Sequence, residues 1–170
     1  MSPTQPVQSL NLPPGCPRGG VHFTPPKLGP GGSGCVHRGT RIHTPHGGRS
    51  VESIRVGDQV VSIDIERNDH EHRIVASVAQ VHCLRSPISV VINQRCRFSP
   101  THRVYEQRVG WLRASEITPN MSVFSIDDGW IRVNSVQCET GYFEVFDLTT
   151  DHPSHTYFAE GLLCHNKQMP

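Results

Sequence analysis

Hydrophobic positions from residue 35 onward fall into short runs separated by turn residues, with no helical repeat. The runs are rich in Val, Ile, Phe and Tyr, which is typical of strands. The predicted strands are 40–43, 59–65, 74–84, 88–98, 104–106, 122–126, 130–138, 143–149 and 156–159. No window of twelve residues holds an apolar stripe at helical spacing, so at most 112–117 forms a helical turn or two. The pattern therefore predicts an all-β fold.

Turn signals support this interpretation. Turns are expected at His46-Gly47-Gly48 and Val56-Gly57-Asp58, and a tight hairpin at Asp127-Asp128-Gly129, because Asp-Gly readily supplies a positive φ. Near the other end, the apolar run Leu162-Leu163-Cys164 predicts a last strand that holds the following residues in place.

The first 34 residues differ from the rest of the chain. They contain eight prolines and end in Gly-Pro-Gly-Gly-Ser-Gly. Such a segment buries little apolar surface and keeps its backbone solvated. We therefore expect a flexible leader over 1–34, a folded domain over 35–166 and a short flank over 167–170.

Composition removes several classes of function. The net charge is +1 without a basic run, so we expect no nucleic-acid partner. No stretch of about 18 apolar residues could span a membrane, and the start of the chain does not resemble a secretory signal. The expected location is the cytoplasm, with the six cysteines as thiols. They lack C-x-x-C spacing, so neither a metal site nor a cofactor is expected, although eleven histidines leave adventitious metal binding open.

A nucleophile stands where the folded part begins. Cys35 follows Gly34, whose carbonyl carries no bulky side chain. Attack of the Cys35 thiol on that carbonyl would turn the Gly34–Cys35 amide, here called the upstream junction, into a thioester. A free cysteine with a pKa of about 8.5 is only a few per cent thiolate at pH 7, so we expect a nearby base or an electropositive setting.

The folded part ends at a second reactive group. Asn166 can attack its own backbone carbonyl with its side-chain nitrogen, closing a succinimide and releasing Lys167. We call the Asn166–Lys167 bond the downstream junction. The neighbouring His165 is suited to polarise that carbonyl or to move the proton that the leaving amine needs. Because the reaction is intramolecular, proximity supplies much of the rate.

A histidine lies between the two ends in sequence. His102 belongs to the segment Phe98-Ser99-Pro100-Thr101-His102-Arg103-Val104, with the Ser99 hydroxyl three residues before it. It could hydrogen-bond the upstream amide and help its nitrogen leave. Any twist of that amide would add about 1–3 kcal/mol of strain.

These segments resemble the Hint superfamily, which comprises inteins, bacterial intein-like domains and Hedgehog autoprocessing domains. Four motifs match in order. They are Cys35-Val36-His37-Arg38-Gly39-Thr40-Arg41-Ile42 with Ile54-Arg55-Val56-Gly57-Asp58, Ser99-Pro100-Thr101-His102, Val145-Phe146-Asp147-Leu148-Thr149 with His155-Thr156-Tyr157-Phe158-Ala159, and Gly161-Leu162-Leu163-Cys164-His165-Asn166. Each motif is weak alone, and the four together span the whole of 35–166.

The resemblance implies a fold and a set of roles. The family fold is a horseshoe-shaped all-β domain with pseudo-twofold halves that brings both ends together. Cys35 would be the acyl-shift nucleophile, and His102 would activate the upstream amide with help from Ser99. Asp147 would couple the two ends. His155 and His165 would assist the cyclisation of Asn166. The implied activity is single-turnover self-processing by a monomer whose substrate is its own flanking sequence.

Two positions depart from the family pattern. Ser99 stands in the place of the usual Thr and keeps the hydroxyl. Lys167 stands where a splicing intein has Cys, Ser or Thr, and an amine side chain cannot take part in ordinary transesterification. The resemblance is therefore to the bacterial intein-like domains that mainly cleave themselves, with inefficient splicing as a side reaction.

Two other classes of function stay open. Cys35, His102 and Asn166 occur in the order of a Cys-His-Asn hydrolase that acts in trans, although no helix is predicted to carry the cysteine. A catalytically silent β module could instead bind zinc or a partner through its histidines. Defined breaks at both junctions would distinguish self-processing from either alternative.

Overall fold

The computed structural model describes residues 34–65 and 72–166. The leader expected over 1–34 therefore lies outside the described residues except for Gly34, as does the flank over 167–170 with Lys167. The described strands are β1 Val36–His37, β2 Arg41–Thr44, β3 Gly47–Ser50, β4 Gln59–Ile63, β5 Arg73–Ile92, β6 Cys96–Phe98, β7 Arg103–Glu106, β8 Gly110–Arg113, β9 Ser122–Ser125, β10 Gly129–Arg132, β11 Val136–Thr150, β12 Thr156–Ala159 and β13 Leu162–His165. This part of the chain also contains the 3-10 turns η1 Val51–Ser53 and η3 Ala114–Glu116. The predicted all-β class is confirmed.

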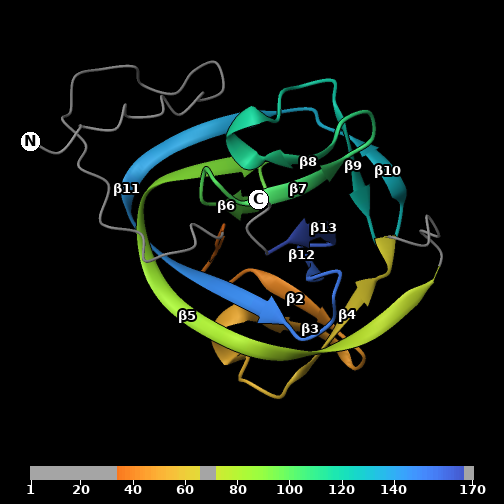
Figure 1. Cartoon of the computed structure of the whole chain (residues 1–170). Helices are drawn as coiled ribbons and strands as arrows, with labels where there is room; N and C mark the ends of the chain where they lie inside the picture. Colours follow the sequence, from red (N-terminus) through yellow and green to blue (C-terminus); the bar gives the residue numbers. More distant parts are fainter. Residues whose placement is uncertain (1–33, 66–71, 167–170) are drawn as a thin grey trace, which may run out of the picture.

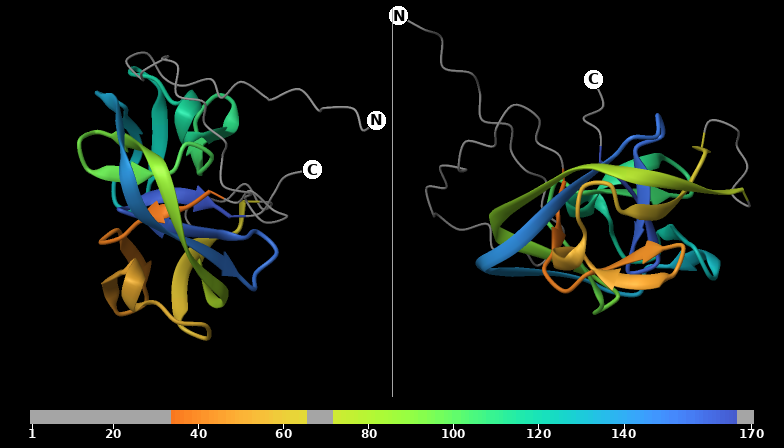
Figure 2. Two further views of the ribbon diagram at one scale, coloured as in Figure 1. Left: turned by 90° about the vertical axis from the view of Figure 1, so that its left-hand side faces the viewer. Right: turned by 90° about the horizontal axis from the view of Figure 1, so that it is seen from below.

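Two long antiparallel strands organise the molecule. β5 and β11 pair from Val136↔Ile92 to Thr150↔Val78. Figure 1 shows them curving together around one side, with β12 and β13 inside the curve, and Figure 2 shows the same pair side by side from other directions. Register shifts at Thr140/Phe143 and Thr149/Thr150 interrupt the pairing. Such bulges bend a strand and increase its twist, which allows the ribbon to wrap around the core.

β5 is one strand where the sequence predicted two. The predicted strands 74–84 and 88–98 are joined across Pro87, although proline lacks the N–H that a ladder needs. The predicted strand 88–98 divides instead at the turn 93–95, between β5 and β6. In the structure Pro87 lies between the pairs Ser86↔Phe143 and Ile88↔Thr140, at the first register shift. The ladder is interrupted at that point, so the missing donor does not prevent β5 from continuing.

Three other boundaries were wrong. The segment predicted as a strand over 130–138 leaves the ladder after β10, because the Asn93 side chain accepts the backbone N–H groups of Asn134 and Ser135 at 2.7 and 3.2 Å. The helical turn predicted over 112–117 begins instead as β8, which pairs with β7, and only η3 is helical. The turn expected at His46-Gly47-Gly48 is shorter, because β3 already begins at Gly47.

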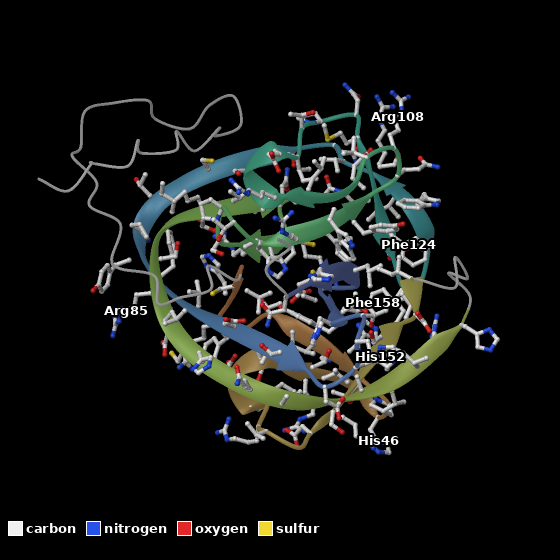
Figure 3. All side chains as sticks on the ribbon, in the orientation of Figure 1. His46, Arg85, Arg108, Phe124, His152 and Phe158 are labelled. Atoms are coloured by element: carbon white, nitrogen blue, oxygen red, sulfur yellow. The ribbon has the colours of Figure 1, made fainter. Side chains whose placement is uncertain are left out.

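The strands form two sheets around a common core. The smaller has the order β11-β1-β6-β5-β4, and the larger follows the path β10-β9-β7-β13-β12-β2-β3, with β8 beside β7. The buried cluster includes Val36, Ile42, Phe98, Leu148 and Tyr157. Figure 3 shows Phe158 among the interior side chains, whereas Arg85 and Arg108 point outward. Strands from both ends of the described chain therefore meet in the middle of the fold.

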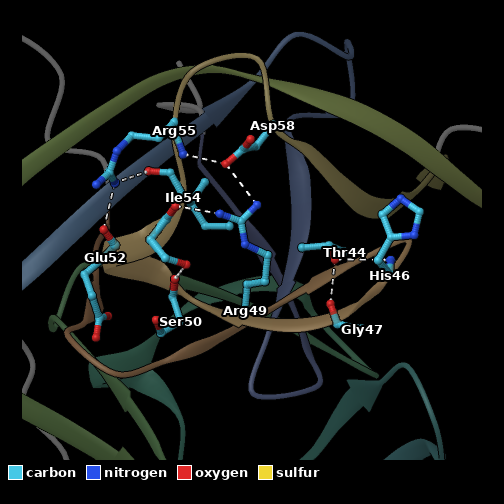
Figure 4. Close-up of polar contacts among 10 residues, drawn as sticks. Thr44, His46, Gly47, Arg49, Ser50, Glu52, Ile54, Arg55 and Asp58 are labelled. Carbon is cyan, nitrogen blue, oxygen red and sulfur yellow. Dashed lines mark hydrogen bonds and ion pairs between the residues drawn. The ribbon is translucent and has the colours of Figure 1, made fainter.

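Polar contacts fasten the segment after β3 to the β2–β3 hairpin (Figure 4). The Arg49 guanidinium donates to Asp58 Oδ2 at 3.2 Å and to the Ser53 carbonyl at 2.7 Å. Asp58 Oδ2 also accepts the backbone N–H of Arg55 at 2.8 Å. These bonds stabilise η1 and the turn that leads into β4.

Two expectations from composition concern membrane-spanning segments and the state of the cysteines. In the described residues, no helix is long and apolar enough to cross a membrane. Cys35, Cys83, Cys96 and Cys164 are free thiols, whereas Cys138 is disulfide-bonded. The prediction of six thiols is therefore wrong for Cys138, because a disulfide between cysteines of unrelated spacing leaves no signal in the sequence.

Candidate functional site

Ser99 holds the backbone of Cys35 at the upstream junction through two hydrogen bonds. Cys35 immediately precedes β1, which pairs with both β11 and β6 through Val36. The Cys35 N–H donates to Ser99 Oγ at 2.8 Å, and the Ser99 N–H donates to the Cys35 carbonyl at 2.9 Å. The nitrogen of the upstream amide is thus bonded to a hydroxyl, while the Cys35 residue is only 3% exposed. The structure gives Ser99, and not His102, the direct contact with that nitrogen.

His102 lies in the core beside Gly34. Its ring is fully buried, stacks on Phe98 with centroids 4.6 Å apart and meets the edge of Tyr157 at 6.3 Å. Its carbonyl accepts the Ala114 N–H at 2.6 Å, which fixes its loop to η3. A Cβ added to Gly34 would stand 1.9 Å from the Cα of His102. The backbone of residue 34 is therefore packed directly on that of His102.

Burial dominates the electrostatics of the upstream junction. It raises the pKa of the Cys35 thiol to about 12; Asp147 adds to this, and the Ser99 hydrogen bond opposes it. Among the described residues, the causes of this shift include no positive charge, and the thiol is protonated at pH 7. Burial also lowers the pKa of His102 to about 4. A hydrogen bond to the Gly34 backbone opposes this shift, and the charge of His165 adds to it. His102 is therefore a neutral imidazole at pH 7.

The last strand holds the downstream junction, as predicted. β13 pairs with β12 on one side and β7 on the other. His165 and Asn166 at its end are 7% and 4% exposed. The Asn166 N–H donates to the His155 carbonyl at 3.0 Å, and its side-chain Nδ2 donates to Thr149 Oγ1 at 3.1 Å. The backbone and the side chain of Asn166 are both bonded to the surrounding fold.

Two histidine rings lie near Asn166. The His155 Nδ1 is 3.0 Å from the Thr150 carbonyl, so this nitrogen carries the proton and Nε2 is the basic one. His155 has a φ of +48°, a conformation that few residues other than glycine adopt and that is concentrated at functional sites. Its ring centroid is 6.5 Å from that of His165, which meets Trp111 edge-on at 4.9 Å.

Asp147 and Tyr157 are two further buried polar residues, on β11 and β12. Asp147 is buried on β11, directly after Phe146, which pairs with Val36 of β1. The pKa of the buried Tyr157 hydroxyl is raised well above its usual value by burial, then by Cys164, Asp147 and Cys35. Tyr157 therefore stays a neutral phenol in the core.

Six of the seven residues singled out from the sequence form two groups, and the seventh, Asp147, lies on β11. Cys35, Ser99 and His102 surround the upstream junction with Gly34, and His155, His165 and Asn166 gather at the downstream one. Their catalytic roles stay predictions. The sequence interpretation missed Thr149, Tyr157 and Trp111. Thr149 had one usable signal, because it follows Asp147 by two residues on a strand and so shares its face. Within 34–65 and 72–166, no group of three or more His, Cys, Asp or Glu side chains is placed to hold a metal.

Comparison with solved structures decides the fold. A bacterial intein-like domain from Clostridium thermocellum superimposes with a TM-score of 0.69 at 20% identity, covering 78% of this chain and 98% of that domain. A DnaB intein from Synechocystis sp. PCC 6803 gives 0.68 at 19% identity, covering 80% and 100%. The TvoVMA intein gives 0.65 at 16% identity, covering 78% and 98%.

The chain has the Hint fold. The resemblance drawn from the four motifs is thereby confirmed at the level of fold. No protein-family model matches this Hint domain, and no curated protein matches it either. The chemistry must consequently be argued from its own residues.

Proposed function

We propose that this Hint domain cleaves the peptide bonds at its own two junctions, once per molecule. The observation that carries the proposal is the burial and fixation of both reactive residues. Cys35 is bonded through its N–H to Ser99, and Asn166 is bonded through its Nδ2 to Thr149. At these two edges of the folded domain, cysteine can form a thioester and asparagine can form a succinimide.

At the upstream junction, the Cys35 sulfur attacks the Gly34 carbonyl carbon. The C–N bond breaks, the thiol proton passes to the departing amine, and a thioester remains. The Ser99 hydroxyl already contacts the amide nitrogen at 2.8 Å and can support its protonation as it leaves. The neutral imidazole of His102 beside Gly34 can accept and return the proton. Water or an external thiol then attacks the thioester carbonyl carbon, which releases the leader and restores the Cys35 thiol.

At the downstream junction, Asn166 Nδ2 attacks its own backbone carbonyl carbon. The bond to Lys167 breaks, one amide proton passes to the new α-amine, and a succinimide remains. His165 precedes Asn166, and the His155 carbonyl accepts the Asn166 backbone N–H, so these two histidines are assigned that proton transfer. With Lys167 after the junction, the ordinary transfer of the leader to a side-chain nucleophile is absent, and cleavage exceeds splicing.

The test is intact-mass analysis of the full chain and of two variants. Cys35→Ala is expected to lose the upstream break and to keep the downstream one, and Asn166→Ala is expected to do the reverse. Breaks at both junctions in both variants would overturn the assignment. Turnover of an added peptide by a chain that stays whole would favour a hydrolase acting in trans, and an inert intact chain would favour a binding module.

A further inference from the structure

We propose that Thr149 is the residue that orients the Asn166 amide for attack at the downstream junction; this rests on the proposed function. Thr149 Oγ1 accepts a hydrogen bond from Asn166 Nδ2 at 3.1 Å. That nitrogen is the atom that must reach the backbone carbonyl carbon. Because Thr149 touches the reacting group itself, its role is distinct from that of the histidines that handle the proton.

The side-chain amide of Asn166 has two different ends. Asn166 can present either its NH2 group or its oxygen to its own backbone, and only the nitrogen closes a succinimide. An acceptor placed on one N–H fixes the rotation of the amide group. It also withdraws a proton partly from a nitrogen whose lone pair is otherwise delocalised into the carbonyl. Both effects favour attack by nitrogen.

The second step concerns the backbone under Thr149. The pairing of β11 with β5 changes register between Thr149 and Thr150, where Gln80 and Val78 are the successive partners. A bulge of this kind re-aims the side chains around it and is common beside active sites. Here the Thr149 hydroxyl meets Asn166, while the Thr150 carbonyl meets His155 Nδ1 at 3.0 Å. The extra residue is Ala79 on β5, and the two β11 residues opposite it contact two groups at the downstream junction.

The third step concerns the position of Thr149 along β11. It follows Asp147 by two residues, so both side chains lie on one face of the strand. Burial raises the pKa of Cys35 and the charge of Asp147 adds to the shift, whereas Thr149 is bonded to Asn166. One strand face therefore carries a residue that acts on each junction. A movement of β11 would change both, which offers a physical route for coupling the two steps.

The test compares three variants of the full chain with residues 167–170 in place. Thr149→Val keeps the shape of the side chain and removes the acceptor, so tail release is expected to slow about tenfold, as for the loss of one well-placed hydrogen bond. Thr149→Ser keeps the hydroxyl and should restore the rate to within about threefold. Thr140→Val, an exposed change on the same strand, should leave it unaltered. Mass spectrometry follows the release of the tail, and the upstream break with added thiol reports that the fold is intact.

Each outcome decides something. A slow downstream break in Thr149→Val, with a normal upstream break and rescue by Ser, supports the proposal. Equal slowing at both junctions, or failure of Ser to rescue, would show that Thr149 has only a structural role. A wild-type rate in Thr149→Val would overturn the inference while leaving the self-processing function intact. If the unmodified chain never releases its tail, the proposed function fails and takes this inference with it.

Discussion

Replacing Gly34 by alanine tests the packing at the upstream junction. The added Cβ would stand 1.9 Å from His102 Cα, 2.4 Å from its backbone nitrogen and 2.7 Å from its Cβ. Carbon atoms in contact normally lie about 3.5–4.0 Å apart, so the backbones of residues 34 and 102 must separate by about 1.6–2.1 Å. The His102 loop cannot simply move away, because it is bonded to η3 through Ala114. The scissile carbonyl is therefore displaced from Cys35 and Ser99.

A displacement of about 1 Å in a reacting group can cost about 100-fold in rate. We therefore expect upstream cleavage of Gly34→Ala to fall by about 100-fold or more, measured as leader release in the presence of a thiol. Tail release should persist, because Asn166 is held by hydrogen bonds to His155 and Thr149. Gly48→Ala is the matched control, since its Cβ meets only the flexible end of the Arg41 side chain. Upstream cleavage of Gly34→Ala at the wild-type rate would refute this account of the junction.

Three further changes have defined outcomes. His102→Ala should slow the upstream break chiefly, and equal rates of leader release in variant and parent would remove its assigned role. At saturating thiol, upstream cleavage in the Asn166→Ala background should rise about tenfold per pH unit from pH 7 to 9, because Cys35 with a pKa of about 12 is ionised only in a small and growing fraction. A rate that levels off as the pH passes about 8.5 would indicate an ordinary thiol. Tyr157→Phe removes a buried hydroxyl without a hydrogen-bond partner among the described residues, so urea unfolding should show a gain of about 1 kcal/mol. A loss of stability in that variant would reveal a partner for the hydroxyl.

The sequence was sufficient for the fold class because the evidence for it is local. Short β-rich runs between turn residues predict strands wherever they occur, and β2, β4, β7, β9 and β12 were found close to their expected positions. The four motifs added the topology by resemblance, because they mark the two edges of the domain. The sequence signal failed where pairing decides the outcome. The gap between the predicted strands 74–84 and 88–98 contains Pro87, yet β5 continues through it because β11 is bulged opposite this point.

The site was predictable only for residues whose chemistry is rare. Cys35 and Asn166 stand out because few side chains can form a thioester or a succinimide. Thr149 and Tyr157 were missed because threonine and tyrosine are ordinary strand residues, and only the register of β11 and β12 shows what they face. The raised pKa of Cys35 could not be predicted either, since it depends on burial by elements distant in sequence.

The most direct test of self-processing is intact-mass spectrometry of the chain joined to a reporter protein at each end, incubated with and without a thiol. The account predicts breaks at Gly34–Cys35 and at Asn166–Lys167, thiol-dependent acceleration of the upstream break only, and little ligated reporter pair because Lys167 follows the downstream junction. A single uncut species under every condition would contradict it and would leave a Hint fold without the chemistry proposed for it.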